Sequence, residues 1–477
     1  MPSIIELRRT TLGLLAALSA AGMLWFGSGL HPFWPLMWLA PLPVLLFAAS
    51  ASWKAALTTA MAAWFVGNLN MWRYYVHVIE MPPGSVIGIC LALSAVFTLA
   101  VLSQRALLLR QDHWSALLAF PSIWASAEYL ISLASPHGTA ASLAYTQLNF
   151  LPLLQLASVT GPWGITFVLT LFPSALAVAA HVRKSNSEQA KRILLISIAA
   201  VAVTVAFGTL RLVWPTHGQT IKVGLIASDP PTSPQVAAPG ADTAALLESY
   251  AEQASKLADA GAQVIVLPEK IGLVDDLSTA SVDARFQRLA SAVDAQIIVG
   301  VLRNQGGRQY NEARWYLPSL ARRSYDKQHL LPSFESNLTP GTVLSMLSDR
   351  SGVRGVAICK DMDFISPARN YGRAGVGLML VPAFDFVADR FLHGHMAVMR
   401  GVENGFTVVR AGKMGYLTVS DDRGRILAEN SSDTAPFATL MAVAPTAHHS
   451  TVFLLLGDWF GWMSLALLAY IVGRLLV

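Results

Sequence analysis

The sequence predicts an α-helical membrane bundle joined to an α/β domain, and three observations lead to this prediction. The chain of 477 residues is 54% hydrophobic and only 13% charged, whereas soluble proteins carry about 25% charged residues. The apolar residues are concentrated in 12–214 and 452–477, and the stretch from 221 to about 442 has the composition of a soluble domain. Lys and Arg lie beside the apolar stretches, so the net charge of +5 fits membrane topology better than nucleic-acid binding.

The apolar parts contain eight candidate membrane spans. A helix needs about 20 apolar residues to cross the ~30 Å hydrocarbon core of a bilayer. We expect spans near residues 11–29, 33–50, 55–75, 86–109, 114–133, 157–182, 193–214 and 452–474. The first span, behind Arg8-Arg9, resembles a signal peptide, but no clean small-residue cleavage site follows it, which favours a retained helix.

The basic residues predict the topology of these spans. With eight spans, one side of the membrane receives Arg8, Arg9, Lys54, Arg105, Arg110, Arg183, Lys184, Lys191, Arg192 and Arg474. The opposite connections, 30–32, 76–85 and 134–156, contain no Lys or Arg, and Arg73 is the one exception nearby. Because basic residues favour the cytoplasmic side, both termini are expected in the cytoplasm and 215–451 outside it.

The predicted domains follow from this topology. We expect a bundle of seven spans over 1–214, an α/β domain over 220–445 and a C-terminal membrane helix over 452–474. The stretch 134–156 is too polar at its start to span, so we expect a re-entrant or interfacial loop on the outer side. Glu128, inside the fifth span, is expected to face the bundle interior rather than to act in catalysis.

The α/β domain is predicted from alternating strands and helices. The apolar runs 221–227, 264–269 and 297–302 have the character of buried strands, and the helical patterns 243–262 and 284–295 separate them. This β-α-β-α-β order is typical of a sheet layered with helices. Further strands are expected at 314–319, 352–359, 377–383, 406–411 and 416–422, the last followed by the turn sequence DDRGR.

Three chemically active residues follow apolar runs in this domain. Glu269 ends VIVLPE, Lys327 lies in SYDKQHLLPSFE, and Cys359 ends GVAIC. In α/β proteins, binding and active sites lie at the carboxyl ends of the strands of the sheet. A carboxylate can take the proton of a thiol, and a lysine can stabilise the charge on an attacked carbonyl oxygen. Together the three side chains make a complete acyl-transfer site.

Each of these residues also has a structural explanation when it is taken alone. Glu269 could be a capping or salt-bridge carboxylate, Lys327 a surface charge and Cys359 a buried core thiol. The other cysteine, Cys90, lies in the apolar run VIGICLALSAVF and is interpreted as a small buried residue. The 11 histidines group closely only at HGH, 393–395, and at 448–449, and no CxxC or His/Cys cluster indicates a metal.

The ordered trio resembles the nitrilase, or carbon–nitrogen hydrolase, superfamily. The elements LPE, YDKQHLLPSFE and a Cys at the end of an apolar strand occur in that order, and the flanking spans narrow the resemblance to the bacterial apolipoprotein N-acyltransferases. Further segments of the chain are similar to that family: PSIWASAEYL, Tyr145-Thr146-Gln147, GPWGITF, the YDKxHLxPxxE pattern of Tyr325, Lys327, His329, Leu330, Pro332 and Glu335, then Pro340-Gly341, Arg400 and Glu403.

The resemblance implies a fold and a mechanism. The domain would be a nitrilase-like α-β-β-α sandwich, beside seven spans before it and one after it. Glu269 would be the general base, Lys327 would stabilise the oxyanion, and Cys359 would take an acyl chain from a phospholipid as a thioester. Glu335 and Asp361 would be accessory carboxylates. The acceptor would be the N-terminal amine of an S-diacylglyceryl-cysteine lipoprotein at the bacterial inner membrane, with no cofactor and no metal.

Departures from the family pattern keep other functions open. Lys360 and Asp361 follow the nucleophile, where the family has an aromatic residue and Glu, and VPAFDF and Lys413-Met414-Gly415 replace two further family elements. One alternative is a membrane-anchored amidase or nitrilase-type hydrolase, or an acyltransferase with a different amine acceptor. Another is a transporter or scaffold without catalysis. The Glu–Lys–Cys trio argues against a scaffold, and the spans lack the broken, charged helices of transporters.

Overall fold

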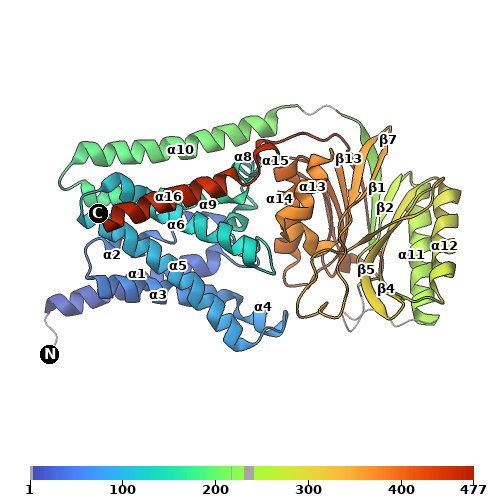
Figure 1. Ribbon diagram of the computed structural model, residues 1–477, viewed down its shortest axis with the longest axis horizontal. Coiled ribbons are helices and arrows are strands. Elements are labelled where there is room, and N and C mark those ends of the chain that lie inside the picture. The colour runs from blue at the N-terminus through green and yellow to red at the C-terminus, as the bar shows by residue number, and fades with distance from the viewer. Residues whose placement is uncertain (1–3, 216–217, 230–240) are drawn as a thin grey trace. The chain divides into compact units, whose positions relative to one another are not determined.

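The computed structural model describes residues 4–215, 218–229 and 241–477 (Figure 1). These residues form two compact units. The first comprises the chain up to Ser135, Thr139–Val213 and Leu456–Val477, and it is helical. The second comprises Pro136–Gly138 and Trp214–Leu455, and it contains all the strands among the described residues.

The helical unit is built from apolar helices of unequal length. Its elements are α1 (Ile4–Gly27), η1 (Trp34–Trp38), α2 (Leu42–Ala48), α3 (Trp53–Asn68), η2 (Leu69–Met71), α4 (Trp72–His77), α5 (Pro83–Leu109), α6 (His113–Ala134), η3 (Leu143–Gln147), α7 (Leu151–Leu154), α8 (Ala157–Thr160), α9 (Pro162–Val182), α10 (Ser187–Val213) and α16 (Trp459–Leu476). Within the described residues, six of them, α1, α5, α6, α9, α10 and α16, are long and apolar enough to cross a membrane.

The second and third expected spans are shorter in the structure. The stretch expected to span at 33–50 is divided between the 3-10 helix η1 and the seven-residue helix α2. Pro35, Pro41 and Pro43 lie in this stretch, and proline disrupts a continuous helix because it lacks the backbone N–H and clashes with the preceding turn. The helix α3 has 16 residues, and the chain then tightens into η2.

Hydrogen bonds fix which helix ends lie together in the helical unit. The side chain of Asn70, after α3, donates to the carbonyl oxygens of Trp25 and Ser28 at the end of α1, at 3.1 and 3.2 Å. Arg105, near the end of α5, donates to the carbonyl oxygen of Ala51 at 2.7 Å. The chain after α2 therefore lies at the end of the bundle where α5 finishes, and the chain after α3 lies where α1 finishes.

Glu128 of α6 is buried inside the helical unit, as the sequence indicates. One carboxylate oxygen accepts from the Trp124 indole at 2.9 Å and from the Leu143 backbone N–H at 2.7 Å. The other accepts from the hydroxyls of Ser142 and Thr166, at 2.7 and 2.8 Å. Four donors satisfy the carboxylate, which explains how an acidic side chain is tolerated among apolar helices.

The second unit contains two sheets. The first has the strand order β13-β1-β2-β4-β5-β6, with β3 also paired to β4, and the second has the order β12-β11-β10-β9-β8-β7. The strands are β1 (Thr220–Ala227), β2 (Val264–Val266), β3 (Leu273–Val274), β4 (Gln296–Gln305), β5 (Arg308–Tyr316), β6 (Arg323–Asp326), β7 (Ser345–Asp349), β8 (Gly352–Val356), β9 (Leu378–Phe384), β10 (Thr407–Lys413), β11 (Tyr416–Ser420), β12 (Ile426–Ser431) and β13 (Ala438–Pro445).

The sheets lie between two layers of helices, which gives the α/β fold that the sequence predicts (Figure 1). Apolar side chains of both sheets form one core between them, including Leu225 and Ile298 from the first and Leu380 and Val409 from the second. The outer layers are α11 (Ala241–Asp259) and α12 (Thr279–Val293) on the first sheet, and α13 (Ile365–Arg373) and α14 (Arg390–Asn404) on the second. The remaining helical elements of the unit are η4 (Cys359–Asp363), η5 (Ser432–Thr434) and α15 (Val452–Leu456).

The amphipathic pattern of α11 explains its position. Its residues Leu247, Tyr250, Ala251, Ala254 and Leu257 recur at spacings of three and four, and all are buried against the first sheet. Burying a large apolar side chain stabilises a fold by roughly 1.5–3 kcal/mol. The helix therefore holds the sheet through this face.

Five strands were not predicted from the sequence. These are the two-residue strand β3 and the strands β6, β7, β12 and β13. β12 and β13 are largely exposed or half-buried, so they lack the continuous apolar run that marks a central strand. β5 also begins earlier than predicted, because Gly306 and Gly307 both adopt positive φ in the tight turn that pairs β4 with β5.

Candidate active site

Cys359 lies where β8 ends and the short 3-10 helix η4 begins. Its φ of +43° is in the left-handed region, which residues with a side chain rarely adopt. The Asp361 carboxylate accepts from the Ile358 N–H at 3.1 Å, and the Asp361 N–H donates to the Ile358 carbonyl at 2.9 Å. These two bonds close the turn around the thiol, whose Sγ lies 3.5 Å from the carbonyl oxygen of Phe384.

Glu269 comes from the other sheet, just after β2. Its backbone N–H donates to the carbonyl of Ala383 in β9 at 3.3 Å, which fixes it between the two sheets. The carboxylate is buried, and its Oε1 accepts from Lys327 Nζ at 2.9 Å and from Asn311 Nδ2 at 2.5 Å. Its Oε2 is buried and has no hydrogen-bond partner among the described residues. One oxygen is therefore held in place, and the other is available to accept a proton.

Lys327 follows β6 and lies between two carboxylates. Its backbone N–H donates to the Asn311 carbonyl at 2.9 Å, and its Nζ is 2.9 Å from both Glu269 Oε1 and Glu335 Oε2. Burial alone would lower the pKa of this ammonium, but the carboxylates of Glu269 and Glu335, with a further contribution from Cys359, raise it well above its ordinary value. Lys327 is therefore a fixed cation and cannot serve as a base.

Glu335 anchors this cation and a second one. Its Oε2 also accepts from the Leu331 backbone N–H at 2.8 Å, and its Oε1 lies 2.7 Å from Lys270 Nζ. Burial raises the pKa of the Glu335 carboxyl, but the charges of Lys327 and Lys270 outweigh burial and lower that pKa far below its ordinary range. Glu335 is thus a permanent anion.

Asp361 is not part of this cluster of side chains. Its carboxylate accepts from the Tyr325 hydroxyl at 2.8 Å and from the backbone N–H groups of Gln328 and His329, at 3.1 and 2.8 Å. It therefore joins the turn of Cys359 to the segment that carries Lys327.

The electrostatics of Cys359 decide which chemistry is open to it. Burial raises the pKa of the thiol to about 12, with a further contribution from Glu269, while His393, Lys327 and Arg410 lower it. At neutral pH the sulfur is a thiol, so it becomes a nucleophile only when a base removes its proton during attack. The free oxygen of Glu269 is suited to that step.

Comparison with known proteins assigns the chain to a family. Residues 13–175 match the model of the apolipoprotein N-acyltransferase N-terminal domain, and residues 232–449 match that of carbon–nitrogen hydrolases. The chain belongs to the apolipoprotein N-acyltransferase family. It is 25% identical to the apolipoprotein N-acyltransferase of Geobacter metallireducens, over 82% of each chain, and 23% identical to that of Vibrio parahaemolyticus, over 92% of each.

A solved structure matches about half of this family member. It is an amidase of the nitrilase superfamily from Nesterenkonia AN1, 20% identical, with a TM-score of 0.41. The match covers 48% of this chain and 92% of the amidase.

The structure of this apolipoprotein N-acyltransferase family member also adds residues that the sequence does not mark. Asn311 of β5 donates to Glu269 Oε1 and, at 2.8 Å, to Glu335 Oε1. His393 of α14 lies close to Cys359, together with Asp385. Asn311 is one polar residue in the strand sequence YNEARWY, and nothing in that pattern shows which way it points. His393 belongs to the HGH group at 393–395, and this group is the one feature of the sequence that draws attention to it.

The unusual lysines of this family member have different positions. The ammonium of Lys360, buried beside Cys359, is 3.2 Å from His137 Nδ1 and 3.5 Å from Asp363. Lys413, at the end of β10, donates to the Lys270 carbonyl at 2.8 Å and lies 3.9 Å from the centre of the Phe384 ring. Burial, with the nearby charge of Lys270, lowers the pKa of Lys413 to about 7. It is thus a lysine that loses its proton near neutral pH.

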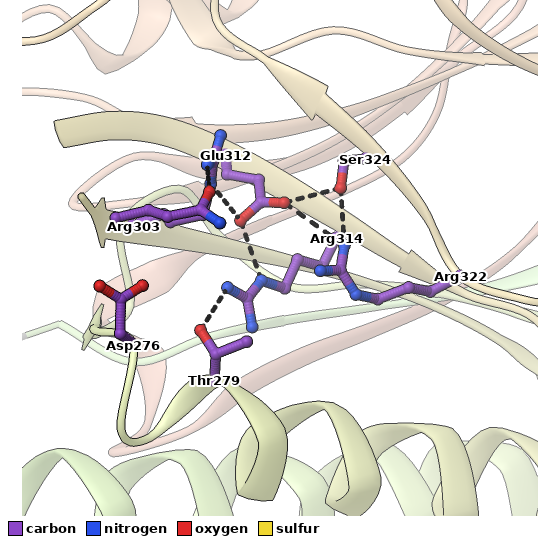
Figure 2. Close-up of a pocket in the computed structure, with 8 residues that line it drawn as sticks. Asp276, Thr279, Arg303, Glu312, Arg314, Arg322 and Ser324 are labelled. Carbon is purple, nitrogen blue, oxygen red and sulfur yellow. Dashed lines mark hydrogen bonds and ion pairs between the residues drawn. The ribbon is translucent and has the colours of Figure 1, made fainter. Parts of the chain in front are cut away.

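A polar pocket, which we call the second pocket to distinguish it from the site around Cys359, lies elsewhere in the domain and contains none of the predicted site residues. It has a volume of about 460 Å³ and lies along β4, β5 and β6 (Figure 2). Glu312, at its centre, is 2.9 Å from Arg314 and 3.1 Å from Arg303. Asp283 takes a further bond from Arg314 at 3.0 Å. These arginines already form ion pairs with carboxylates. The side chains of the pocket therefore form a structural ion network rather than a binding site for an anion.

Proposed function

We propose that this chain transfers an acyl chain from a phospholipid, through a thioester on Cys359, to the N-terminal amine of an S-diacylglyceryl-cysteine lipoprotein. The observation that carries the proposal is the buried cluster in which Lys327 joins Glu269 to Glu335 beside the Cys359 thiol. The relatives that the chain matches over most of its length are apolipoprotein N-acyltransferases, which supports this acceptor.

The first step forms the thioester. The Cys359 sulfur attacks the ester carbonyl of the phospholipid while Glu269 Oε2 takes the thiol proton. The Lys327 ammonium stabilises the negative charge on the carbonyl oxygen. When the tetrahedral intermediate collapses, the C–O bond breaks, the proton on Glu269 passes to the departing alkoxide, and a lysophospholipid leaves.

The second step releases the acyl chain. The acceptor amine attacks the thioester carbonyl, its proton passes to Glu269, and the C–S bond breaks. The same proton then returns to the sulfur, which restores the Cys359 thiol and leaves an amide. Lys327, Glu269 and Glu335 are each no more than 3% exposed. A site so closely surrounded by protein limits entry of water, which favours attack by the amine over hydrolysis.

We further propose that the helical unit crosses the bilayer seven times before the catalytic domain and once after it. The contacts of Ala51 with Arg105 and of Asn70 with Ser28 support this, because they make α2 and α3 run between opposite ends of the bundle. Together with the six longer helices, these two short helices give eight crossings. The short helices need local thinning of the bilayer or polar flanks at the interface.

The basic residues support an orientation for these crossings. Arg110 and Arg474 lie at the bundle end where α5 finishes, and Arg474 pairs there with Asp112 at 2.7 Å. We therefore place both termini in the cytoplasm and the catalytic domain outside the inner membrane. The proposed domains are the bundle over 1–214, the catalytic domain over 220–445 and the last helix over 452–474.

The acyl-enzyme is tested with a labelled phospholipid. Purified wild-type protein should acquire label that hydroxylamine releases, because hydroxylamine cleaves thioesters. Cys359→Ala should acquire none while showing the same thermal unfolding in detergent, and Cys90→Ala is the matched control that should label normally. Equal labelling of the wild type and Cys359→Ala would exclude the proposed thioester.

The acceptor is tested separately in cells. A strain depleted of its own apolipoprotein N-acyltransferase should grow when it expresses this chain, and not when it expresses Cys359→Ala at the same level. If a well-expressed wild-type chain forms the thioester but does not support growth, the acceptor is a different amine.

A further inference from the structure

A row of alternating charges runs beside Cys359. Its members are Lys360, Asp363, His393, Asp385 and Arg410, and each lies against the next. Lys360 is 3.5 Å from Asp363, and Arg410 forms a two-pronged pair with Asp385 at 2.5 and 2.7 Å. His393 stands in the middle, so its charge is set by the two carboxylates that flank it.

Both ring nitrogens of His393 face a carboxylate. Nδ1 lies 2.9 Å from Asp385 and Nε2 lies 3.1 Å from Asp363. A carboxylate accepts hydrogen bonds only, so each nitrogen must carry a proton to interact favourably. Burial lowers the pKa of this histidine, but Asp363, Cys359 and Asp385 raise it well above its ordinary value. His393 is therefore an imidazolium cation at neutral pH.

The same geometry places this cation next to the nucleophile. One ligand atom each from Cys359, Asp385 and His393 lie within 4.8 Å of one another. Such a trio has the composition of a metal site, but a metal ligand needs a nitrogen lone pair, and both nitrogens here face carboxylates. The guanidinium of Arg410 also pairs with the Asp385 carboxylate, which is therefore already bound to a cation.

We propose that His393 is a positioning residue of the acyl-transfer site, a fixed imidazolium that stabilises negative charge on the Cys359 sulfur as it attacks and again as it leaves. This role rests on the proposed thioester chemistry. It supplements Lys327, whose ammonium is already held by Glu269 and Glu335. Burial and the Glu269 carboxylate act in the opposite direction, because both raise the pKa of the Cys359 thiol.

The charged groups near His393 come from several elements packed around it. Those that face the imidazole or its carboxylates are Asp363 and Lys360 on η4, Asp385 after β9, Asp389 before α14 and Arg410 on β10. His395, two residues further along α14, bonds instead to the Phe391 carbonyl at 2.9 Å, and burial lowers its pKa. It is a neutral neighbour that provides a matched control.

The test measures the reactivity of the sulfur itself. The full chain carrying Cys90→Ala, so that Cys359 is its single cysteine, is alkylated with iodoacetamide in detergent over a range of pH, and the rate is followed by mass spectrometry. In His393→Gln the rate at each pH should fall by on the order of tenfold, and the profile should move to higher pH by about one unit, because a charge within 5 Å is removed. His393→Lys should restore most of the rate, and His395→Gln should leave it unchanged.

Two results would overturn the role of His393. One is wild-type alkylation in His393→Gln, and the other is an equally slow reaction in His393→Lys, which would show that the imidazole matters for packing rather than charge. Thermal unfolding is recorded for each variant. If His393→Gln does not fold, His393→Asn replaces it, and if neither folds, the profile of His393→Lys decides alone.

The labelled-phospholipid assay on the same proteins separates this inference from the proposed function. A shifted alkylation profile without thioester in the wild type would reject the acyl transfer and keep the imidazolium. A normal thioester with an unshifted profile would reject the imidazolium alone.

Discussion

The two oxygens of Glu269 have different surroundings, and this difference indicates which of them takes the proton in the proposed mechanism. Oε1 receives the Lys327 ammonium and the Asn311 amide, whereas Oε2 has no partner among the described residues. An oxygen with two strong donors is a poor proton acceptor, so the unpartnered oxygen is the basic one. Asn311 thus matters because it orients the carboxylate and keeps Oε2 free.

Lys413 gives a prediction about pH at the scale of one residue. Its pKa in the folded protein is about 7, below its ordinary value of 10.5. Between these values the unfolded chain binds more protons than the folded one, so this residue makes stability rise with pH there. Below about pH 7 the full cost of burying the ammonium is present. Lys413→Met should therefore raise the unfolding temperature most at pH 7 and below, with the gain shrinking towards pH 10.5.

Thermal unfolding of the detergent-solubilised protein at several pH values checks this expectation. Lys256→Met, at an exposed position of α11, is the control and should have a small effect that does not vary with pH. A loss of stability in Lys413→Met at neutral pH would show that the bond to the Lys270 carbonyl outweighs the burial of charge.

At the scale of elements, the strands β4, β5 and β6 are held by the ion network of the second pocket. Glu312 is 2% exposed and Arg314 is fully buried. Glu312→Gln leaves Arg314 without its anion on the strand, and removing one partner of a buried pair costs about 3–5 kcal/mol. We expect a clear fall in the unfolding temperature, with acyl-enzyme formation per folded molecule unchanged.

The matched control is an ion pair on the surface of the same domain. Arg285 and Glu248 join α12 to α11 at 2.6 Å, with side chains 33% and 49% exposed. Glu248→Gln should cost less than about 1 kcal/mol, because solvent screens exposed pairs. Equal losses in Glu248→Gln and Glu312→Gln would contradict the structural role of the buried network.

The elements also show what the sequence could and could not predict. The central strands β1, β2 and β4 were predictable because each is a run of buried apolar residues. The strand β13 pairs with β1 although the two lie at opposite ends of the domain sequence. Most of its residues are exposed or only partly buried, without a regular alternation, so the pairing depends on tertiary contacts that a local pattern does not contain.

The same distinction applies to the candidate site. Glu269, Lys327 and Cys359 follow apolar runs or lie in a distinctive motif, so the sequence marks them. Asn311 and His393 gain their meaning only from partners across the two sheets. The sequence places Lys360 next to Cys359 but does not show which way its side chain points, and in the structure its ammonium contacts His137 and Asp363.

At the scale of the whole molecule, one connection distinguishes eight crossings from six. If α2 and α3 cross the membrane, the loop at Ser50 is cytoplasmic, and if only the six long helices cross, it lies outside. Because the Ala51 carbonyl binds Arg105 near the end of α5, we expect the cytoplasmic location. A single cysteine at Ser50, in a chain without its two natural cysteines, should react with an impermeant maleimide only after the membrane is opened.

Two further single cysteines calibrate this experiment. Gly84→Cys lies outside and Ser185→Cys lies inside under both topologies, and the space around Gly84 is open. Labelling of Ser50→Cys in intact cells, at the rate of Gly84→Cys, would rule out the eight-crossing arrangement.

The left-handed backbone of Cys359 has a consequence for how such a site persists. Only glycine adopts this conformation without strain, and for other residues it costs roughly 1–2 kcal/mol. A glycine at this position would relieve that strain but would lack the sulfur that the proposed reaction needs. If the proposed thioester chemistry is correct, the backbone strain at this turn is retained because the reaction needs a side chain there.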